Sequence, residues 1–326
     1  MPAYGLVVEN GWVRAQIYTN RESGGIDPRI GEETMGRQEQ PFGICAVGLK
    51  GAEYLGKLIA GNCAPERVFS YRQVDDVSNS IDKITALCRS NHIDYSESLV
   101  ADFAGDKPLF FVGWQHLVKE PRNNFIVMHD SLLPKFRGFA PTVNALIKGE
   151  KRIGVTAFKP DDNYDTGPIL GQLGFDVTYP IRIEQALRQQ ASLMARLTIE
   201  ILHSYKSGQY TAVAQDNDAS TYSIWRDEQD YQIDWKTSAA EIRRFVDAVS
   251  FPYAGARTRI RDQVLVVDEA TELEELFFEL RHAGKVCRLE DSKPIVVCGS
   301  GLLRLDKVLT LDGKPYVFQR LRTRLL

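Results

Sequence analysis

The stretch that decides the fold class is residues 41–61, PFGICAVGLKGAEYLGKLIAG. Residues 42–47 are an apolar run that ends at a glycine, as buried strands do, and residues 50–61 have the apolar spacing of a helix. The glycines at 48, 51 and 56 lack the spacing of a dinucleotide-binding loop, so we interpret them as a tight strand-to-helix turn. The stretch predicts the first strand and helix of an α/β fold.

The pattern continues toward residue 112. Strand-like runs lie at 67–71, 92–95 and 108–112, and a helix-like run at 77–90 lies between the first two. Strands that alternate with helices indicate a parallel α/β sheet of the Rossmann-like kind. Because ligands bind at the carboxyl ends of such strands, the loops after Val47 and Val112 are where we expect a site.

Four segments divide the chain. Residues 1–40 are predicted to be an extension with a short hairpin and a loop, and residues 41–210 the α/β domain, which ends in a long helix over 183–208. Residues 211–254 are predicted to be a linker. Residues 255–326 contain short strands punctuated by glycine turns, which predicts a small β-rich, barrel-like domain.

Composition excludes several classes of protein. The 326 residues suit two domains, and 44% hydrophobic with 25% charged residues is the balance of an ordinary globular protein. No window resembles a secretory signal or a membrane span. The five cysteines form no CxxC pair, which favours reduced thiols, so we expect a cytoplasmic location. The net charge of −3 provides no general attraction to nucleic acid or membranes.

Two polar residues near the middle of the chain are candidates for chemistry. His129 follows an apolar strand over 125–128, and Asp165 lies in a loop before a glycine and a proline. A histidine at a strand end is also a common structural residue, and an aspartate before Thr-Gly is a common turn former. Residue types and spacing alone do not pair these two side chains.

Three linked motifs carry a resemblance that does pair them. They are HDSLLPKFRGFAP (129–141), GEKRIGVT (149–156) and DTG (165–167). In this order and spacing they resemble the core of the formyltransferases that use N10-formyltetrahydrofolate. The similarity covers roughly residues 41–210. IDW (233–235), PYAGA (252–256) and VCGSG (297–301) extend it, because they look like the linker and C-terminal β-domain of two-domain members.

The resemblance implies a mechanism and a site. His129 would be the base or proton shuttle for attack by an amine, and Asp165 would orient it and raise its basicity. N10-formyltetrahydrofolate would be the co-substrate, and no metal is implied. The pterin would lie against the loop after residue 112 and the loop before Asp165, at Phe111, Val112, Gly113, Trp114, Asp161, Asp162, Asn163 and Tyr164. Ser131 and Arg137 are expected to contact the acceptor, with a structural role as the alternative for Arg137.

One position departs from the family pattern. The family places an asparagine two residues before the histidine, as an amide donor to the oxyanion, whereas this chain has Val127. We predict that Gln115 replaces it, with an ordinary loop residue as the alternative; the other amide candidates are Asn123, Asn124 and Asn144. Because of Val127, a homologue that binds folate but does not catalyse transfer is the alternative interpretation.

The acceptor is predicted to be small. The loop over 70–77 is short and acidic at its centre, and residues 251–326 hold 13 Lys and Arg against 11 Asp and Glu, whereas phosphate backbones require clustered cations. HDSLLP with RGFAP, and WRDEQDY (225–231), look most like sugar N-formyltransferases. We therefore expect a nucleotide-linked amino sugar, destined for lipopolysaccharide or another surface glycan, and no nucleic-acid or membrane partner. Two other activities stay open, those of a methionyl-tRNA formyltransferase and of a formyl-folate hydrolase. A homodimer is possible in either case.

Overall fold

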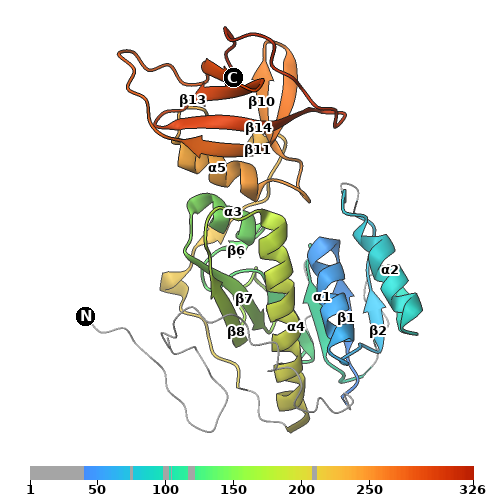
Figure 1. Cartoon of the computed structure of the whole chain (residues 1–326). Coiled ribbons are helices and arrows are strands. Elements are labelled where there is room, and N and C mark those ends of the chain that lie inside the picture. The colour runs from blue at the N-terminus through green and yellow to red at the C-terminus, as the bar shows by residue number, and fades with distance from the viewer. Residues whose placement is uncertain (1–39, 74–75, 98–102, 104, 117–121, 208–210) are drawn as a thin grey trace. The chain divides into compact units, whose positions relative to one another are not determined.

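The computed structural model describes residues 40–73, 76–97, 103, 105–116, 122–207 and 211–326. The hairpin and loop predicted within residues 1–40 lie outside the described residues, apart from Gln40. The chain divides into two compact units (Figure 1). The first contains residues 1–138, 153–175 and 187–222, and the second contains residues 139–152, 176–186 and 223–326.

The first unit is built on a seven-stranded sheet in the order β3-β2-β1-β4-β5-β7-β8. Strands β1 to β5 pair in parallel, which confirms the predicted parallel α/β sheet, and β7 adds an antiparallel strand beside β5. The strands are β1 (Gly43–Ala46), β2 (Arg67–Phe69), β3 (Asp94–Ser96), β4 (Leu109–Val112), β5 (Phe125–His129), β7 (Arg152–Phe158) and β8 (Ile169–Asp176). A short strand β6 (Arg137–Gly138) follows β5.

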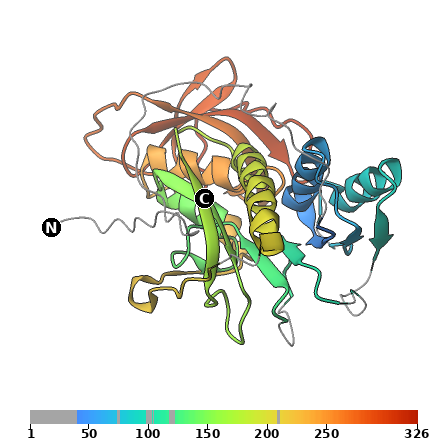
Figure 2. The same cartoon turned by 90° about the horizontal axis from the view of Figure 1, so that it is seen from below.

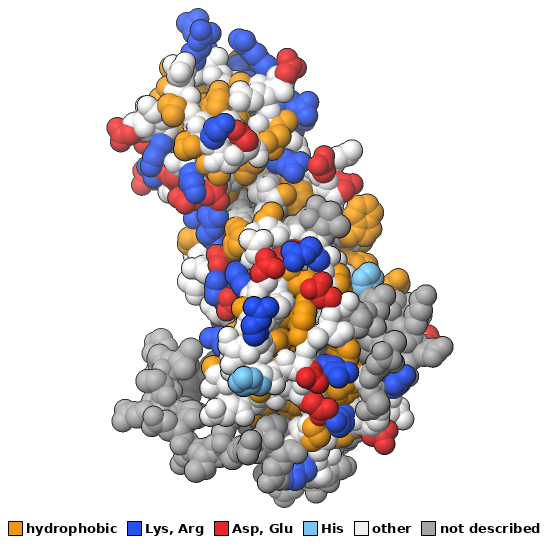
Figure 3. Space-filling model, turned by 90° about the vertical axis from the view of Figure 1, so that its right-hand side faces the viewer, with side chains coloured by type: hydrophobic (Ala, Val, Ile, Leu, Met, Phe, Trp, Pro, Cys, Tyr) orange, Lys and Arg blue, Asp and Glu red, His pale blue; other side chains and the backbone are white. Residues whose placement is uncertain are grey.

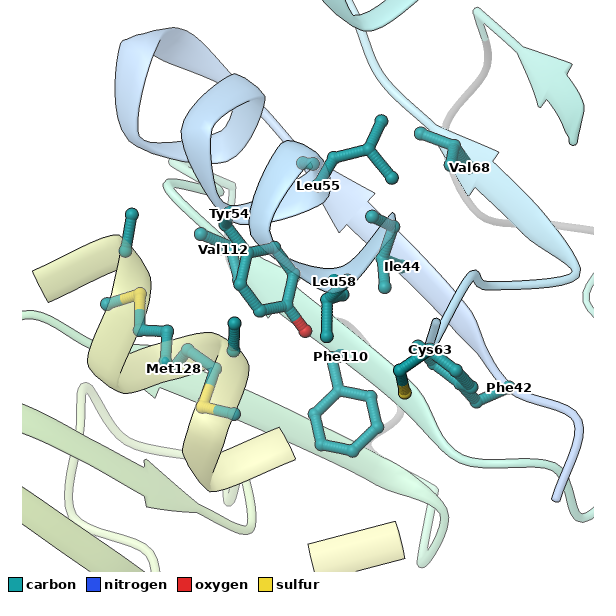
Figure 4. Close-up of a cluster of buried hydrophobic side chains, with 14 of the residues drawn as sticks. Phe42, Ile44, Tyr54, Leu55, Leu58, Cys63, Val68, Phe110, Val112 and Met128 are labelled. Carbon is teal, nitrogen blue, oxygen red and sulfur yellow. The ribbon is translucent and has the colours of Figure 1, made fainter. Parts of the chain in front are cut away.

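Helices α1 (Gly48–Ala60), α2 (Ser80–Ser90) and the C-terminal part of α4 (Ile183–Ser207) pack against one face of this sheet. The alternate residues of β1, β4 and β5 that point to this face are apolar, as the period of a strand requires. Figure 4 shows Tyr54 and Leu58 of α1 above Phe110 of β4. The Tyr54 hydroxyl is hydrogen-bonded to Thr198 Oγ1 of α4 at 2.8 Å, which satisfies a polar group that burial would otherwise penalise.

The opposite face of the sheet carries a smaller apolar cluster. Its buried members are Cys45, Phe69, Phe103, Leu109, Phe111 and Phe125, with Trp114 and Val127 packed against them. By strand alternation His129 points to the same face as Phe125 and Val127.

Close packing of β7 against β8 depends on a glycine. A Cβ built at Gly154 would lie 2.3 Å from the carbonyl oxygen of Leu173 and 2.7 Å from Leu132 Cδ2. The Gly154→Ala substitution is therefore expected to lower the free energy of unfolding by about 1–3 kcal/mol, as overpacking does. Gly56→Ala in α1 is the matched control, because its Cβ would meet nothing closer than 4.0 Å and alanine favours helix. Urea unfolding of both variants checks the prediction, and an equal effect of the two would contradict it.

The second unit is a curved antiparallel sheet with two helices. The sheet order is β10-β11-β14-β13-β12, formed by β10 (Ala256–Ile260), β11 (Gln263–Leu273), β12 (Val286–Glu290), β13 (Lys293–Val297) and β14 (Leu302–Thr310). Helix α5 (Ala239–Ala248) lies against β11 (Figure 2). Helix α3 (Pro141–Lys148) packs on α5, so a segment that the sequence placed in the α/β domain clusters with the second unit.

The last residues close the edges of this sheet. Leu326 exchanges two 2.9 Å backbone hydrogen bonds with Arg259 on the β10 edge, and Leu325 N–H donates to Gly284 O at 2.7 Å just before β12. Because both edges of the sheet are paired, their backbone N–H and C=O groups are not left open to pair with another chain, as in a closed barrel. The predicted β-rich domain is therefore confirmed. The remaining short elements are η2 (Asn217–Ala219), β9 (Tyr222–Ser223) and η3 (Gln229–Tyr231).

Among the described residues, no helix has both the length and the apolar composition needed to cross a membrane. Acidic and basic side chains are mixed over the face of the molecule in Figure 3, and no field of one sign dominates that face.

Candidate functional site

His129 and Asp165 are neighbours in the structure. His129 ends β5 and is only 6% exposed, and its Nδ1 lies 3.5 Å from Oδ2 of Asp165 in the loop between β7 and β8. Oδ2 also accepts a 2.7 Å hydrogen bond from the backbone N–H of Gly138. The fold therefore brings together two residues that are 36 positions apart in the sequence.

The surroundings of His129 define which ring nitrogen is reactive. Its Nε2 lies 2.8 Å from the carbonyl oxygen of Phe136. A carbonyl only accepts hydrogen bonds, so Nε2 carries the proton and donates it. Nδ1 is then the nitrogen that carries no proton in the neutral ring, and it faces the carboxylate of Asp165. The geometry is that of an oriented base with a carboxylate partner.

The turn after β5 is held by a buried hydroxyl. Thr156 Oγ1 in β7 donates to Ser131 O at 2.7 Å and accepts from Leu133 N–H at 3.0 Å. Gln172 Nε2 of β8 donates to Leu133 O at 2.7 Å. These bonds satisfy the backbone of a sharp turn, and they fix the path of the chain to Phe136, whose carbonyl orients the imidazole.

Asp165 is held in an unusual conformation by a residue from far along the chain. Its φ is +55°, in the left-handed region. Gln215 Nε2 donates to both Asp165 O and Gly167 O at 2.8 Å, and its Oε1 accepts from Arg137 Nε at 3.1 Å and from an Arg137 terminal nitrogen at 2.8 Å. Arg137 also donates to Asn217 Oδ1 at 2.9 Å. A network of hydrogen bonds thus connects β6, the Asp165 loop and the segment before η2.

Gln215 was not among the residues that the sequence suggested. It lies 50 positions after Asp165, within the stretch predicted to be a linker, and no motif marks it. Residues 211–222 in fact belong to the first unit. Thr221 anchors them there, because its Oγ1 accepts from Phe136 N–H at 2.9 Å and its carbonyl accepts from Arg137 N–H at 2.8 Å.

Replacing Gln215 by leucine is expected to lower the free energy of unfolding by about 2–3 kcal/mol. Arg137 is only 1% exposed, and the loss of a carboxamide acceptor from a buried cation costs more than the loss of a neutral hydrogen bond. Chemical denaturation measures the effect. Gln189→Leu on the exposed side of α4 is the matched control and should change stability by less than about 0.5 kcal/mol. A Gln215 variant as stable as this control would rule out a supporting role for the network.

Arg137 and Ser131, the predicted acceptor contacts, both make internal hydrogen bonds. Arg137 is buried and donates to Gln215 and Asn217, while Ser131 is 4% exposed and its hydroxyl donates to Lys135 O at 2.6 Å. In this structure both stabilise the turn after β5 and its neighbours. A contact with an acceptor stays a prediction for each.

The predicted pterin-binding residues lie on two loops. Phe111 and Val112 are buried in β4, Gly113 follows with φ +67°, and Trp114 is half-buried against Phe111 and Tyr71. In the second loop Asp161 accepts hydrogen bonds from the hydroxyl of Thr166 at 2.7 Å and 2.8 Å and from Asn163 N–H at 3.1 Å. These bonds order the loop and leave the side chains at 162–164 exposed.

Val127 occupies the sequence position of the family's asparagine. Val127 packs against the apolar cluster that contains Phe111, and Gln115 is exposed in the loop after β4. Asn124 donates to Lys107 O at 2.6 Å, and Asn144 of α3 belongs to the second unit. Gln115 as the oxyanion donor stays a prediction. Within the described part of the chain, no three His, Cys, Asp or Glu side chains gather as metal ligands would.

Both units match known protein families. Residues 114–215 match the formyl transferase family, and residues 226–321 match the formyl transferase C-terminal domain, which together cover about three fifths of the chain. Two relatives are named methionyl-tRNA formyltransferase. The one from Geobacter metallireducens is 32% identical over 201 residues, 61% of this chain and 62% of that protein. The one from Microcystis aeruginosa is 33% identical over 211 residues, 61% of this chain and 64% of that protein. The matched part thus spans less than two thirds of either relative.

Solved structures share the fold. An N-formyltransferase from Helicobacter canadensis, in complex with folinic acid and dTDP-3-aminofucose, aligns with a TM-score of 0.59 at 17% identity, over 85% of this chain and 100% of that one. HypX from Aquifex aeolicus aligns with a TM-score of 0.56 at 15% identity, over 88% of this chain and 46% of that one. The first match contains the His129–Asp165 pair and the second contains the antiparallel sheet, and together they show that this chain belongs to the formyl transferase family.

Proposed function

We propose that this protein transfers a formyl group from N10-formyltetrahydrofolate to the amino group of a nucleotide-linked amino sugar. The observation that carries the proposal is the His129–Asp165 pair, in which Nδ1 of His129 lies 3.5 Å from Oδ2 of Asp165. The other ring nitrogen, Nε2, is held by the carbonyl oxygen of Phe136. Formyl transfer to an amine requires removal of a proton from the attacking nitrogen, which an oriented imidazole provides.

The chain's own residues account for the proton transfer. Nδ1 of His129 takes the proton of the attacking amine, and Asp165 stabilises the resulting imidazolium at 3.5 Å. The folate nitrogen then leaves as the formyl carbon bonds to the amine, and the same imidazolium returns a proton. Gly138 N–H, 2.7 Å from Asp165 Oδ2, keeps the carboxylate in place during both steps.

The residues proposed to hold the folate fit that group. Trp114 is half-buried, so part of its aromatic surface is exposed in the loop directly after β4. The loop over 161–165 is ordered by Asp161, so its backbone groups can be presented without a large loss of entropy on binding. Related folds bind folinic acid in the Helicobacter canadensis enzyme and tetrahydrofolic acid in HypX.

Many cations that a nucleic-acid backbone would need form ion pairs within the chain, which supports a small acceptor. In the loop after β2 the described cation Arg72 is paired with Asp82 at 3.2 Å. Seven of the 13 cations in residues 251–326 form ion pairs, which leaves less positive charge for a phosphate backbone. The fold is also shared with WlaRD, a sugar 3N-formyl transferase, with a TM-score of 0.58.

Methionyl-tRNA formyltransferase is the second candidate. Two observations favour it: the names of the relatives from Geobacter metallireducens and Microcystis aeruginosa, and the run of Arg320, Arg322 and Arg324 near the end of the chain. Alternate arginines on one short segment would suit phosphate contacts.

Incubation with N10-formyltetrahydrofolate and either amino-sugar nucleotides or aminoacylated initiator tRNA separates the two candidates. Mass spectrometry detects a formyl group on the acceptor, and His129→Gln is the control. Transfer to a sugar nucleotide supports the first proposal. Formylation of the tRNA with no reaction of any sugar would reverse the order of the candidates, and tetrahydrofolate release without an acceptor would indicate a hydrolase.

A further inference from the structure

A buried glutamine of helix α4 contacts the chain just beyond the end of β5. Gln190 is 0% exposed, although glutamine is mostly found on protein surfaces. Its Nε2 donates to Gly154 O of β7 at 2.9 Å and to Asp130 O at 3.1 Å. Asp130 directly follows His129. One side-chain nitrogen therefore joins α4 to both strands that meet at the site.

The place of these two carbonyls explains why an amide suits the position. The backbone pairing of β5 with β7 ends at the pair His129–Thr156. Asp130 and Gly154 lie beyond this pair, where the ladder has stopped. A buried carbonyl without a hydrogen bond lowers stability, and a carboxamide nitrogen has two N–H groups to donate. A single glutamine can thus satisfy one oxygen on each strand.

The side chain of Asp130 is held separately from its carbonyl. Its Oδ1 lies 2.5 Å from Nζ of Lys50 in α1, and the two side chains are only 12% and 16% exposed. The residue after His129 is therefore fixed by one helix through its side chain and by another through its backbone. Because neighbouring residues share a planar peptide group, this limits the dihedral angles at the end of β5.

We propose that Gln190 is a positioning residue, which sets the direction of the His129 ring by fixing the end of β5. In that direction Nε2 of His129 lies 2.8 Å from Phe136 O, and Nδ1 lies 3.5 Å from Asp165 Oδ2. Without the amide the end of β5 can shift, and hydrogen bonds weaken steeply as their geometry departs from the optimum. The role of His129 in turnover rests on the proposed function, whereas the direction of its ring does not.

Gln190→Met tests the proposal, because methionine is an unbranched, flexible side chain that lacks both donors. We expect kcat for formyl transfer to fall about tenfold and KM to change less than about threefold, since misplacement of the base affects the chemical step rather than affinity. Gln190→Asn keeps the amide on a shorter side chain that reaches at most one of the two carbonyls. Its kcat should fall less, and it tests the proposal if Gln190→Met does not fold.

Thr198→Val is the matched control. Thr198 is also fully buried in α4, and its Oγ1 is hydrogen-bonded to the hydroxyl of Tyr54 at 2.8 Å. It lies about 12 Å further along the helix axis than Gln190, at a rise of about 1.5 Å per residue. The variant therefore loses a buried hydrogen bond of α4 without changing the end of β5. It should unfold at a lower urea concentration and keep the native kcat.

NMR of the imidazole nitrogens measures the direction of the ring without turnover. In alkaline buffer an imidazole is neutral, and the nitrogen shifts distinguish the ring nitrogen that carries a proton from the one that does not. Native His129 should carry its proton on Nε2 alone, because Phe136 O accepts it. Gln190→Met should give a mixture of the two tautomers, since a looser contact with this carbonyl lets either nitrogen carry the proton. The signals lost in His129→Gln identify the ring.

A lower kcat and mixed tautomers in Gln190→Met, with neither change in Thr198→Val, support the positioning role. A folded Gln190→Met protein with the native kcat and a single tautomer would show that Gln190 only stabilises the fold, which overturns the inference. The same changes in Thr198→Val would overturn it as well. Mixed tautomers in Gln190→Met, with no formyl transfer by the native protein, would leave this inference standing and refute the proposed function instead.

Discussion

Replacement of His129 by glutamine will lower kcat for formyl transfer by about 10²–10⁴-fold, the usual contribution of a general base. Glutamine can still donate to the Phe136 carbonyl, 2.8 Å from the imidazole Nε2 in the native chain, so the turn after β5 should persist. What the variant lacks is a nitrogen in the position of Nδ1 that accepts a proton beside Asp165. The effect should fall on kcat, with KM changed little, because the ring acts on the proton rather than on affinity.

Single-turnover kinetics with saturating N10-formyltetrahydrofolate measure this loss directly. Thermal unfolding of the variant provides the control, since a large loss of stability would make the kinetic result ambiguous. Activity within tenfold of the wild type, in a folded variant, would mean that His129 is not the base.

Asp165→Asn is the prediction with the second largest expected effect, a loss of about 10²-fold in kcat, at the lower end of what acid–base catalysis contributes. Asparagine tolerates the left-handed conformation at φ +55° and can still accept from Gly138 N–H, so the backbone of the loop is preserved. The substitution removes only the negative charge that stabilises the imidazolium 3.5 Å away.

Asp165→Ala is the informative comparison. Alanine loses the acceptor for Gly138 N–H and is disfavoured at a positive φ, so it should reduce stability as well as activity. If both variants were as active as the wild type, the carboxylate would have no electrostatic role. A loss confined to KM in both would instead place Asp165 in substrate binding.

The network around Gln215 links these predictions. Asp165 adopts its conformation because Gln215 holds its carbonyl at 2.8 Å and Arg137 holds Gln215 in turn. Any substitution in this network should therefore act on catalysis through the orientation of Asp165. It should lower kcat less than Asp165→Asn does, because the charge remains present.

Several elements followed from the sequence alone. The apolar runs and intervening amphipathic stretches predicted β1, α1, β4 and α4 within a few residues, because strands and helices with one buried face have distinct periods. The helix α5 was missed, although Ser238 and Glu241 form the capping box that marks its start. Strand β8 was missed because Gly171 and Gly174 interrupt its alternation, and the antiparallel direction of β7 was not foreseen because local sequence does not specify strand direction.

What the sequence by itself determined is the α/β fold class, the β-rich second unit and, through its motifs, the two residues of the His129–Asp165 pair. Tertiary structure decided the rest of the site. The 3.5 Å approach of the pair, the support of Asp165 by Gln215 and the contact of Lys50 with Asp130 all join segments that are distant in sequence. Periodicity records which face of an element is buried, whereas such contacts depend on how the chain crosses between elements, and only the folded chain specifies that.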